Sequence, residues 1–472
     1  MIRRTKIVAT LGPATDPPRV LKQVLAAGVD VVRLNYSHGT ADDQAKRVEA
    51  VRKAAAELGR DIGILADLQG PKIRIESFKA GPIELAEGQT FALDTAWPKA
   101  EGTAEVVGCA YADLPRDVAT GDTLLLNDGA ITMKVDKIEN TRITGTVLVG
   151  GTLSNRKGIN RLGGGLSAAA LSFKDKIDIR EAVALDVDFI AVSFPRSAAD
   201  MLEARALVKE AQGNAALIAK IERAEALQEL SEIIGVSDGV MVARGDLGVE
   251  IGDAELPGWQ KKIINQAREQ NRMVITATQM MESMITSPIP TRAEVLDVAN
   301  AVMDGTDAVM LSAETATGKY PLKVVEAMAR VCEGAERAAP PSDRVRLEGH
   351  FERTDEAIAM ATTWTARNMQ ASAIIALTES GSTPLLMSRT DTRIPIYAMT
   401  RHERTRRRMG LVRNVFPIDF TPVSIMAPIK EAVMALVQRG LLKVGDRVLL
   451  TKGDFTGPGG TNEMKIIKVE EV

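Results

Sequence analysis

The chain of 472 residues is long for a single hydrophobic core, and a length of roughly 150 residues per domain predicts about three domains. The fractions of hydrophobic residues (45%) and charged residues (26%) are those of an ordinary globular protein, so there are enough apolar residues to form a core. Because the net charge is only −3 and aromatic residues make up 3% of the chain, neither bulk attraction to nucleic acid nor a base-stacking surface is expected.

The cysteines and the amino-terminal segment indicate the compartment. Cys109 and Cys332 lie far apart and belong to no paired motif, so neither a disulfide framework nor a zinc site is predicted. Residues 1–6 lead directly into a strand-like run without the apolar core of a signal peptide, and no run reaches membrane-spanning length. We therefore expect a cytoplasmic protein with no membrane partner.

Strand and helix patterns alternate over residues 5–67. Apolar strand-like runs occupy residues 5–10, 30–34 and 62–67. One helix face precedes Gly28, and a longer helix over residues 41–58 is closed by Gly59. This βαβαβ order predicts a parallel sheet.

The pattern changes at Gly70, and little helical periodicity follows until about Ser167. Asn127-Asp128-Gly129 separates two apolar runs and is a hairpin signal. We predict a small all-β domain over residues 71–167, inserted into the α/β domain and left through the flexible glycines at 163–165. Such an insertion could act as a lid.

Alternation of strands and helices resumes after the insertion. The further predicted strands lie near residues 187–193, 216–221, 238–243, 272–277 and 306–311, and with the first three they make eight. Eight such units close naturally into a parallel (β/α)8 TIM barrel, here built from residues 1–70 and 168–337, whose active site should lie at the carboxyl ends of the strands.

A polar run from Pro340-Pro341 to about Arg353 indicates a linker. Beyond it, a helix is predicted over residues 355–368, and the predicted strands are 372–377, 394–399, 447–451 and 464–469. The fold class is therefore α/β: a barrel with an inserted β lid and a C-terminal α/β domain over residues 354–472.

A lysine and two carboxylates stand at the ends of two neighbouring predicted strands. Lys220 and Glu222 are two residues apart in a strand, so their side chains should project to the same side. Asp246 follows the next apolar run and its glycines. Carboxylate oxygens suit Mg²⁺ or Mn²⁺, and the lysine suits phosphoryl transfer or enolate formation. The alternative is a set of surface ion pairs of little energetic value.

Most of the other predicted strands also end in polar residues, which independent surface positions would not do. These residues are Arg33, Asn35, Ser37, Asp67, Ser193, Arg244, Thr278, Gln279, Ser312 and Glu314. The sequence contains no Walker A motif, no protein-kinase catalytic loop and no dinucleotide-binding glycine motif, and its three histidines are not spaced as metal ligands. Any nucleotide must be held in another way.

Six motifs, in order along nearly the whole chain, resemble the signature blocks of the pyruvate kinase family. They are Arg33-Leu-Asn-Tyr-Ser-His38, Asp67-Leu-Gln-Gly-Pro-Lys-Ile-Arg74, Ala219-Lys-Ile-Glu222, Met241-Val-Ala-Arg-Gly-Asp-Leu-Gly248, Ala277-Thr-Gln-Met280 and Met310-Leu-Ser-Ala-Glu-Thr315. The run Lys157-Gly-Ile-Asn-Arg-Leu-Gly-Gly-Gly165 is similar to the lid exit of one bacterial branch.

The resemblance implies glycolytic transfer of phosphate from phosphoenolpyruvate to ADP, giving pyruvate and ATP. Glu222 and Asp246 would hold the Mg²⁺ or Mn²⁺ ion, and Lys220 would stabilise the moving phosphoryl group and the enolate. Arg33 would clamp the phosphate. The carboxylate would sit on the Gly245-Asp246 backbone and Thr278, which is also the candidate proton donor. The nucleotide-side positions would be Asn35, His38, Arg74 and Lys157.

Two other functions stay open at this stage. A metal-dependent aldolase or lyase acting on 2-oxo acids would use similar acidic ligands and an arginine, but it has no need of a lid over ADP. A catalytically silent sensor of sugar phosphates would leave catalytic positions unfilled, whereas every one is filled here.

The C-terminal domain carries a predicted phosphate pocket. Hydroxyls and backbone amides gather at a predicted helix start, in the residues Thr378, Ser380, Gly381, Ser382 and Thr383. Residues 401–408 and 453–462 could complete it, or the basic run could be a solvated face. The resemblance implies an allosteric site for AMP or a sugar monophosphate, and a homotetramer.

Lys72 affects whether the protein is expected to need a monovalent cation. In the family, K⁺ is held by groups that match Asn35, Ser37, Asp67 and the carbonyl of Leu68, and many members carry glutamate where this chain has Lys72. One charge at about 4 Å and an effective dielectric near 20 is worth about 4 kcal/mol, enough for a tethered ammonium to replace an ion. We expect activity without K⁺, unless Lys72 points to solvent.

Overall fold

The computed structural model describes residues 2–339, 351–423, 428–453 and 459–470. The predicted linker therefore lies almost entirely outside the described residues. The chain folds as two compact units, one of Met1–Ala66, Leu185–Phe189 and Ile264–Val472, the other of Asp67–Ala184 and Ile190–Ile263. These units do not follow the predicted domain boundaries, which stay predictions.

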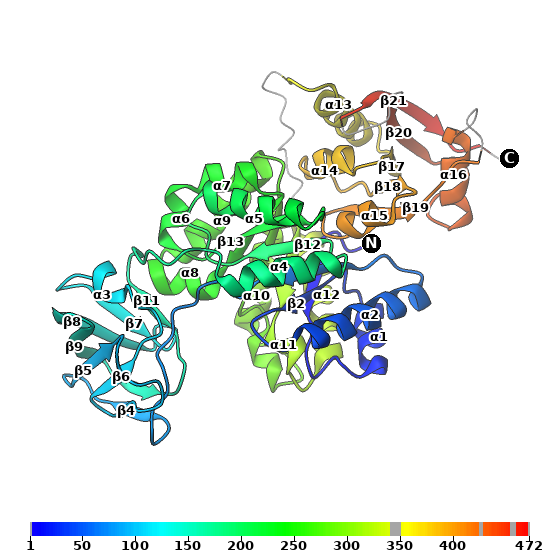
Figure 1. Cartoon of the computed structure of the whole chain (residues 1–472). Coiled ribbons are helices and arrows are strands. Elements are labelled where there is room, and N and C mark those ends of the chain that lie inside the picture. Colours follow the sequence, from blue (N-terminus) through cyan, green and yellow to red (C-terminus); the bar gives the residue numbers. More distant parts are fainter. Residues whose placement is uncertain (1, 340–350, 424–427, 454–458, 471–472) are drawn as a thin grey trace. The chain divides into compact units, whose positions relative to one another are not determined.

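Eight parallel strands form a closed barrel in the order β1-β16-β15-β14-β13-β12-β3-β2, as the sequence predicts (Figure 1). Their bounds are β1 Lys6–Thr10, β2 Val31–Asn35, β3 Gly63–Asp67, β12 Phe189–Val192, β13 Ala216–Ile221, β14 Gly239–Ala243, β15 Met273–Ala277 and β16 Ala308–Leu311. Nearly all of their residues are buried, because a parallel barrel is covered on its outer face by helices and filled on its inner face by side chains.

Helices follow the strands around the barrel. They are α1 Pro18–Ala26, α2 Ala41–Leu58, α4 Phe173–Ala184, α5 Ala198–Glu210, α6 Ala224–Gln228, α7 Leu230–Val236, α8 Arg244–Ile251, α9 Leu256–Glu269, α10 Arg292–Asp304, α11 Ala313–Ala316 and α12 Pro321–Ala338, with a 3₁₀ turn, η1, at Glu282–Ile285. Helix α2 has the predicted bounds: Thr40 and Asp43 form a capping box at its start, and Gly59 ends it at φ 61°.

The segment between β3 and α4 is rich in short strands, as predicted for the insertion. A six-stranded sheet has the order β11-β7-β8-β9-β5-β6, and β10 pairs with β4. The bounds are β4 Ile83–Leu85, β5 Thr90–Asp94, β6 Val106–Gly108, β7 Thr123–Leu126, β8 Ile131–Glu139, β9 Arg142–Val149, β10 Gly151–Leu153 and β11 Ile159–Arg161, with one short helix, α3 Leu114–Asp117. The predicted hairpin joins β7 to β8, and Asn127 and Asp128 take the left-handed φ of 53° and 54° that its turn requires.

The C-terminal residues form a five-stranded sheet in the order β19-β18-β17-β20-β21, with only the last pair antiparallel. Its elements are α13 Thr354–Asn368, β17 Ala373–Leu377, α14 Ser382–Ser388, β18 Ile396–Thr400, α15 Glu403–Met409, β19 Val415–Asp419, α16 Pro428–Gln438, β20 Arg447–Gly453 and β21 Thr461–Lys468. Sequence patterns missed β19, which contains a proline, and α15, whose seven residues are too few to show a helical period, whereas the start of α14 was predicted.

An aspartate precedes every second barrel strand and caps the strand beside it. Asp30, Asp188, Asp238 and Asp307 stand just before β2, β12, β14 and β16. Their carboxylates accept the backbone N–H groups of Ile7, Ile64, Leu217 and Val274 at 2.7–2.9 Å. Each carboxylate is also paired with an arginine: Arg3, Arg407, Arg205 and Arg389 in the same order. The amino ends of the strands are thereby held by charge-assisted hydrogen bonds.

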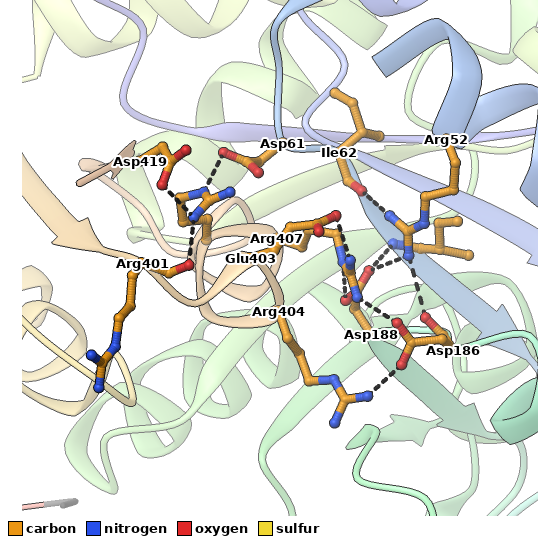
Figure 2. A network of polar contacts seen from close by, with 12 residues as sticks. Arg52, Asp61, Ile62, Asp186, Asp188, Arg401, Glu403, Arg404, Arg407 and Asp419 are labelled. Atoms are coloured by element: carbon orange, nitrogen blue, oxygen red, sulfur yellow. Dashed lines mark hydrogen bonds and ion pairs between the residues drawn. The ribbon is translucent and has the colours of Figure 1, made fainter. Parts of the chain in front are cut away.

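The basic run of α15 contributes to this arrangement (Figure 2). Arg407 is only 6% exposed, and its Nε lies 2.7 Å from Oδ1 of Asp188. Arg406 is 8% exposed and bridges Asp61 and Asp419 at 3.0 and 2.9 Å. The interpretation of this run as a solvated face is therefore wrong for both residues, whose guanidinium groups are engaged by carboxylates.

We expect Arg407→Met to destabilise the protein by about 3 kcal/mol, because it removes one partner of a buried pair and leaves Asp188 short of positive charge. Arg404→Met on the same helix is the matched control. Arg404 pairs with Asp186 where both side chains are about half exposed, so its loss should cost less than about 1 kcal/mol. Urea unfolding of the two variants measures the difference, and equal costs would contradict the prediction.

Candidate active site

Lys220 lies in a cluster of polar groups at the carboxyl ends of β3, β12 and β13. Its Nζ is 2.9 Å from Oε1 of Glu222 and 3.2 Å from Oδ1 of Asp67, and it donates to Oγ of Ser193 at 2.7 Å. Strand alternation therefore placed Lys220 and Glu222 correctly on one side. The ammonium stands between two carboxylates, which fixes its position.

Burial makes the charged carboxylates of this cluster unfavourable unless positive charge lies beside them. Glu222 is 2% exposed and Asp67 is 1% exposed. Burial raises the pKa of Glu222, Lys220 opposes that rise, and the nearby charges of Asp246 and Asp67 add to it. Because several carboxylates share one region of low solvent access, a further positive charge near Glu222 and Asp246 would be stabilised.

Phe194 helps to hold Glu222. It follows β12 with a φ of 57°, an unusual conformation for a bulky residue, and its N–H donates to Oε2 of Glu222 at 2.9 Å. Both carboxylate oxygens of Glu222 are therefore engaged, one by Lys220 and one by this strained backbone.

Asp246 lies in the first turn of α8, whereas the sequence indicated only that it follows glycines whose backbone could approach a ligand. Helix α8 begins at Arg244, directly after β14 ends, and Gly245 and Gly248 are helical. The amino end of a helix carries a partial positive charge, so the Gly245-Asp246 turn can meet an anion. The ability of this turn to bind an anion therefore comes from the start of a helix and not from the flexibility of glycine.

Lys72 contacts the predicted metal ligand. Its Nζ lies 2.9 Å from Oδ1 of Asp246 and 3.3 Å from Oδ1 of Asp128, and its side chain is 22% exposed. Burial lowers the pKa of Lys72, but Asp246 and Asp128 outweigh this effect and raise it above its ordinary value. The alternative in which Lys72 points to solvent is wrong, and the ammonium charge lies beside Asp246.

The carboxylates fit a hard divalent ion in part. Within the described residues, no three or more histidine, cysteine, aspartate or glutamate side chains gather into a complete metal-binding set. Glu222 and Asp246 supply two oxygen ligands, and Mg²⁺ commonly takes one or two carboxylates and completes its shell with water and substrate phosphate oxygens. The residues present therefore suit an ion that is shared with a phosphorylated substrate.

The ends of β1 and β2 carry a second group of predicted residues. Arg33 donates from Nη1 to Oγ1 of Thr10 at 3.0 Å. The turn after β2 is closed by the N–H of His38, which donates to the carbonyl of Asn35 at 3.2 Å. Gln44 of α2 donates its side-chain amide to both of these residues' carbonyl oxygens. Sequence patterns did not identify Gln44, because its role depends on the turn conformation.

Thr278 and Gln279 follow β15 with φ angles of 69° and 54°. A β-branched residue rarely adopts a left-handed conformation, and such strain collects at functional positions. The hydroxyl of Thr278 donates to the carbonyl of Ala277 at 2.6 Å. This strained turn agrees with a functional role for Thr278, although its predicted part in substrate binding and proton donation stays a prediction.

The insertion brings two predicted nucleotide-side residues onto paired segments. Arg74 forms an antiparallel bridge with Gly158, next to Lys157, and its guanidinium donates to the carbonyl of Arg156 at 2.9 Å. The N–H of Ile75 donates to the carbonyl of Lys157 at 2.9 Å. Arg74 and Lys157 are thus neighbours, although they are far apart in the sequence.

The predicted phosphate pocket begins a helix, as expected. Gly381 has a φ of 84° and immediately precedes α14, and its N–H donates to Oγ1 of Thr378 at 3.0 Å. The other three hydroxyls are also hydrogen-bonded: Thr383 to Thr461 at 2.6 Å, Ser382 to Asp355 at 3.3 Å, and Ser380, which accepts the N–H of Ser382 at 3.4 Å. Residues 454–458, part of the segment expected to complete the pocket, lie outside the described residues.

Glu250 was missed by the sequence reading. It lies in α8, four residues after Asp246, and is 2% exposed. Its carboxylate accepts the N–H of Ala224 at 2.9 Å and the side-chain amide of Asn160 at 3.3 Å. Burial raises the pKa of Glu250 to about 7. The only available signal was a second acidic residue one helical turn from Asp246.

A closed barrel with a buried lysine–carboxylate cluster at its strand ends defines a (β/α)8-barrel enzyme suited to anionic chemistry. Residues 2–325 match the family "Pyruvate kinase, barrel domain", and residues 356–467 match "Pyruvate kinase, alpha/beta domain". The chain belongs to the pyruvate kinase family and is a phosphotransferase. The resemblance noted in its six motifs is confirmed.

Relatives match over the full length. The chain is 53% identical over 478 residues to pyruvate kinase II of Salmonella typhimurium and 52% identical over 475 residues to pyruvate kinase of Haemophilus influenzae, with 99% of each chain covered. It is 42% identical to the pyruvate kinase of Sporosarcina psychrophila, covering 98% of this chain and 80% of that one. Within the described residues, no helix is long and apolar enough to span a membrane.

The raised pKa of Glu250 predicts a pH-dependent contribution to stability. A carboxyl group with a pKa of 4.5 when unfolded and about 7 when folded favours the folded chain below pH 4.5, and this advantage is lost as the pH rises to about 7. The loss amounts to at most about 3 kcal/mol.

We therefore expect Glu250→Gln, which cannot ionise, to become more stable relative to the wild type as the pH rises from 5 to 8. Urea unfolding of both proteins at these two pH values measures the change. Glu232→Gln is the control, because Glu232 is an exposed carboxylate on α7. A stability difference that does not vary with pH would contradict the prediction.

Proposed function

We propose that the chain transfers the phosphoryl group of phosphoenolpyruvate to ADP, giving pyruvate and ATP in glycolysis. The observation that carries the proposal is the position of Lys220, which is fixed between Glu222 and Asp67 at the barrel strand ends of a pyruvate kinase family member. Phosphoryl transfer depends mainly on positioning and charge stabilisation, and a fixed buried ammonium provides both.

The proposed role of each residue follows from its charge. Glu222 and Asp246 hold the divalent ion, Mg²⁺ or Mn²⁺, which when bound neutralises phosphate and enolate oxygens. Lys220 stabilises the phosphoryl group in transfer and the enolate that remains. The N–H groups of the Gly245-Asp246 turn bind the substrate carboxylate. Asp246 must exchange its contact with Lys72 for a contact with the ion, at least in part.

Three further roles complete the proposal. Arg33 binds the transferred phosphate, and Thr278 contacts the substrate and supplies the proton to the enolate, directly or through water. Asn35, His38, Arg74 and Lys157 serve the nucleotide; Arg74 and Lys157 are neighbours in the structure, which supports a shared role. The aldolase or lyase alternative finds no support in the comparisons, whose relatives are named pyruvate kinases. Formation of ATP from phosphoenolpyruvate, ADP and Mg²⁺ tests the proposal directly.

We expect Lys220→Met to lower kcat at least about 100-fold, because it removes a charge that acts mainly on the transition state. Mn²⁺ and phosphoenolpyruvate should still bind, which titration by electron paramagnetic resonance or fluorescence can follow. Lys209→Met, at an exposed position of α5, is the control and should keep its activity. Unchanged turnover of Lys220→Met would overturn the assignment.

We also propose that the enzyme does not need K⁺, because the ammonium of Lys72 provides positive charge near the site. Its place beside Asp246 and its raised pKa support a permanent charge there. The monovalent-cation positions Asn35, Ser37, Asp67 and Leu68 would then not require an ion.

The expected result is full activity in buffers with only Tris or Na⁺ as cations, and a K⁺ requirement in Lys72→Glu. Initial rates with and without KCl at constant ionic strength measure both. A wild-type enzyme that is nearly inactive until KCl is added would contradict this interpretation of Lys72.

A regulatory function is proposed for the C-terminal residues 354–472, beside a catalytic barrel of residues 1–70 and 168–337 and a lid of residues 71–167. AMP or a sugar monophosphate would bind at Thr378, Ser380, Gly381, Ser382 and Thr383, and coupling would pass between the subunits of a cytoplasmic homotetramer. The start of α14 after Gly381 supports this site, because it directs backbone N–H groups to one point.

The added carboxylate of Ser380→Asp should repel a phosphate and abolish activation without lowering basal turnover. Rates at low phosphoenolpyruvate concentration, with and without AMP or a sugar monophosphate, measure the effect. If activation survives the substitution, the pocket lies elsewhere.

A further inference from the structure

A small cavity lies where the insertion joins the rest of its unit. Its volume is about 20 Å³, which is room for about one water molecule. Its lining includes Lys72 from the entering connection, the segment by which the chain enters the insertion, and Asn160 from the leaving connection, the segment by which it returns to the barrel. Phe194, Arg223 and Glu250 line it from segments that belong to the barrel. Both connections of the insertion therefore meet at one partly open cavity.

Glu250 joins three segments at this site. One carboxylate oxygen accepts the side-chain amide of Asn160 in β11, the strand through which the chain leaves the insertion. The other accepts the N–H of Ala224, the first residue of α6. The carbonyl of Glu250 also accepts the N–H of Gly163 at 2.9 Å. Helix α8, which carries Glu250, packs against β11 (Figure 1).

Ala224 ties this arrangement to the proposed chemistry, because it follows Lys220, Glu222 and Arg223 directly. The turn between β13 and α6 thus has a proposed catalytic residue at one end and a hydrogen bond to Glu250 at the other. Helix α8 adds a second link, since Asp246 lies one turn before Glu250 on the same helix. Glu250 is therefore linked to the segments that carry Glu222 and Asp246.

The charges around Glu250 fit a carboxylate that is held in place. Arg223 is 4% exposed, attracts Glu250, and donates to the carbonyl of Leu166 at 2.7 Å beyond β11. Glu225 repels Glu250 and accepts the N–H of Gly165. Lys72 lines the same cavity. Arg223 from the turn after β13 and Glu225 from α6 thus reach the leaving connection, as Glu250 does from α8.

We propose that Glu250 is a positioning residue that fixes the leaving connection of the insertion against the end of β13 and the turn after it, which carry Lys220 and Glu222. Closure of the insertion over the nucleotide is thereby linked to the placement of the catalytic lysine and the metal ligand. The inference rests on the proposed function, because it assigns Glu250 a part in that same reaction. Glu250 touches no reacting atom and acts through Ala224 and Asn160.

Steady-state kinetics of Glu250→Ala and Glu250→Gln with phosphoenolpyruvate, ADP and Mg²⁺ test the proposal. Glu250→Ala removes the acceptor of both hydrogen bonds, and we expect kcat to fall about 10- to 100-fold and the KM for ADP to rise, because displacements near 1 Å have effects of this size. Glu250→Gln keeps one acceptor oxygen and the side-chain shape, and it should restore kcat to within a few-fold of the wild type. Glu232→Ala, an exposed position of α7, is the matched control.

Asn160→Ala separates the effects of the two hydrogen bonds of Glu250, since it removes the bond to β11 and leaves the bond to Ala224 in place. This variant should raise the KM for ADP while kcat changes less than in Glu250→Ala. It also keeps the test decisive if Glu250→Ala does not fold, because a KM for ADP equal to the wild-type value would then overturn the proposal.

The outcomes distinguish this inference from the proposed function. A wild-type protein that forms no ATP from phosphoenolpyruvate and ADP would overturn the proposed function. An active wild type with a folded Glu250→Ala variant of wild-type kinetics would overturn only the role of Glu250. Equal losses in Glu250→Ala and Glu250→Gln would also overturn it, because the retained acceptor would then have no effect.

Discussion

The structure depends on carboxylates at the amino ends of alternate barrel strands, of which Asp188 and Asp307 are fully buried and Asp30 and Asp238 partly exposed. Asp30, Asp188, Asp238 and Asp307 each accept a backbone N–H from the neighbouring strand and pair with an arginine. A buried carboxylate without such partners would cost several kcal/mol, so Asp188 and Asp307 are favoured only when the neighbouring strand and the arginine are both in place. This mutual requirement fixes the strand register.

At the carboxyl ends of the strands, the charges are not balanced in this way. Lys220, Glu222 and Asp67 are also buried and paired, but here the carboxylates outnumber the ammonium, and the pKa of Glu222 is raised. Burial that would be unfavourable for stability alone prepares the site to stabilise added positive charge. The strained backbones of Phe194 and Thr278 belong to this same end, where local cost is tolerated because the strands beneath are rigid.

Much of this organisation could be predicted from the sequence. Apolar runs with polar ends identified all eight barrel strands, and the alternation of side chains placed Lys220 beside Glu222. Contacts set by tertiary structure could not be found in this way. The helical start of α8 was hidden because Gly245 and Gly248 are typical of loops. Arg406 and Arg407 resembled a solvated charge run, because the carboxylates that bury them lie in distant parts of the chain. Glu250 has partners in two other segments and no local motif.

The pairing of Arg407 with Asp188 also orders events during synthesis. The two residues are 219 positions apart, so at about 5–20 residues per second the ribosome adds Arg407 about 10–45 seconds after Asp188. Until then Arg52, which is made earlier, is the arginine at hand for Asp188. Arg389 and Asp307 repeat this order over 82 positions. The nascent barrel therefore reaches its final ion pairing only when the C-terminal residues emerge, and a chain that stops short of them leaves the ribosome with two of its strand-capping aspartates incompletely paired.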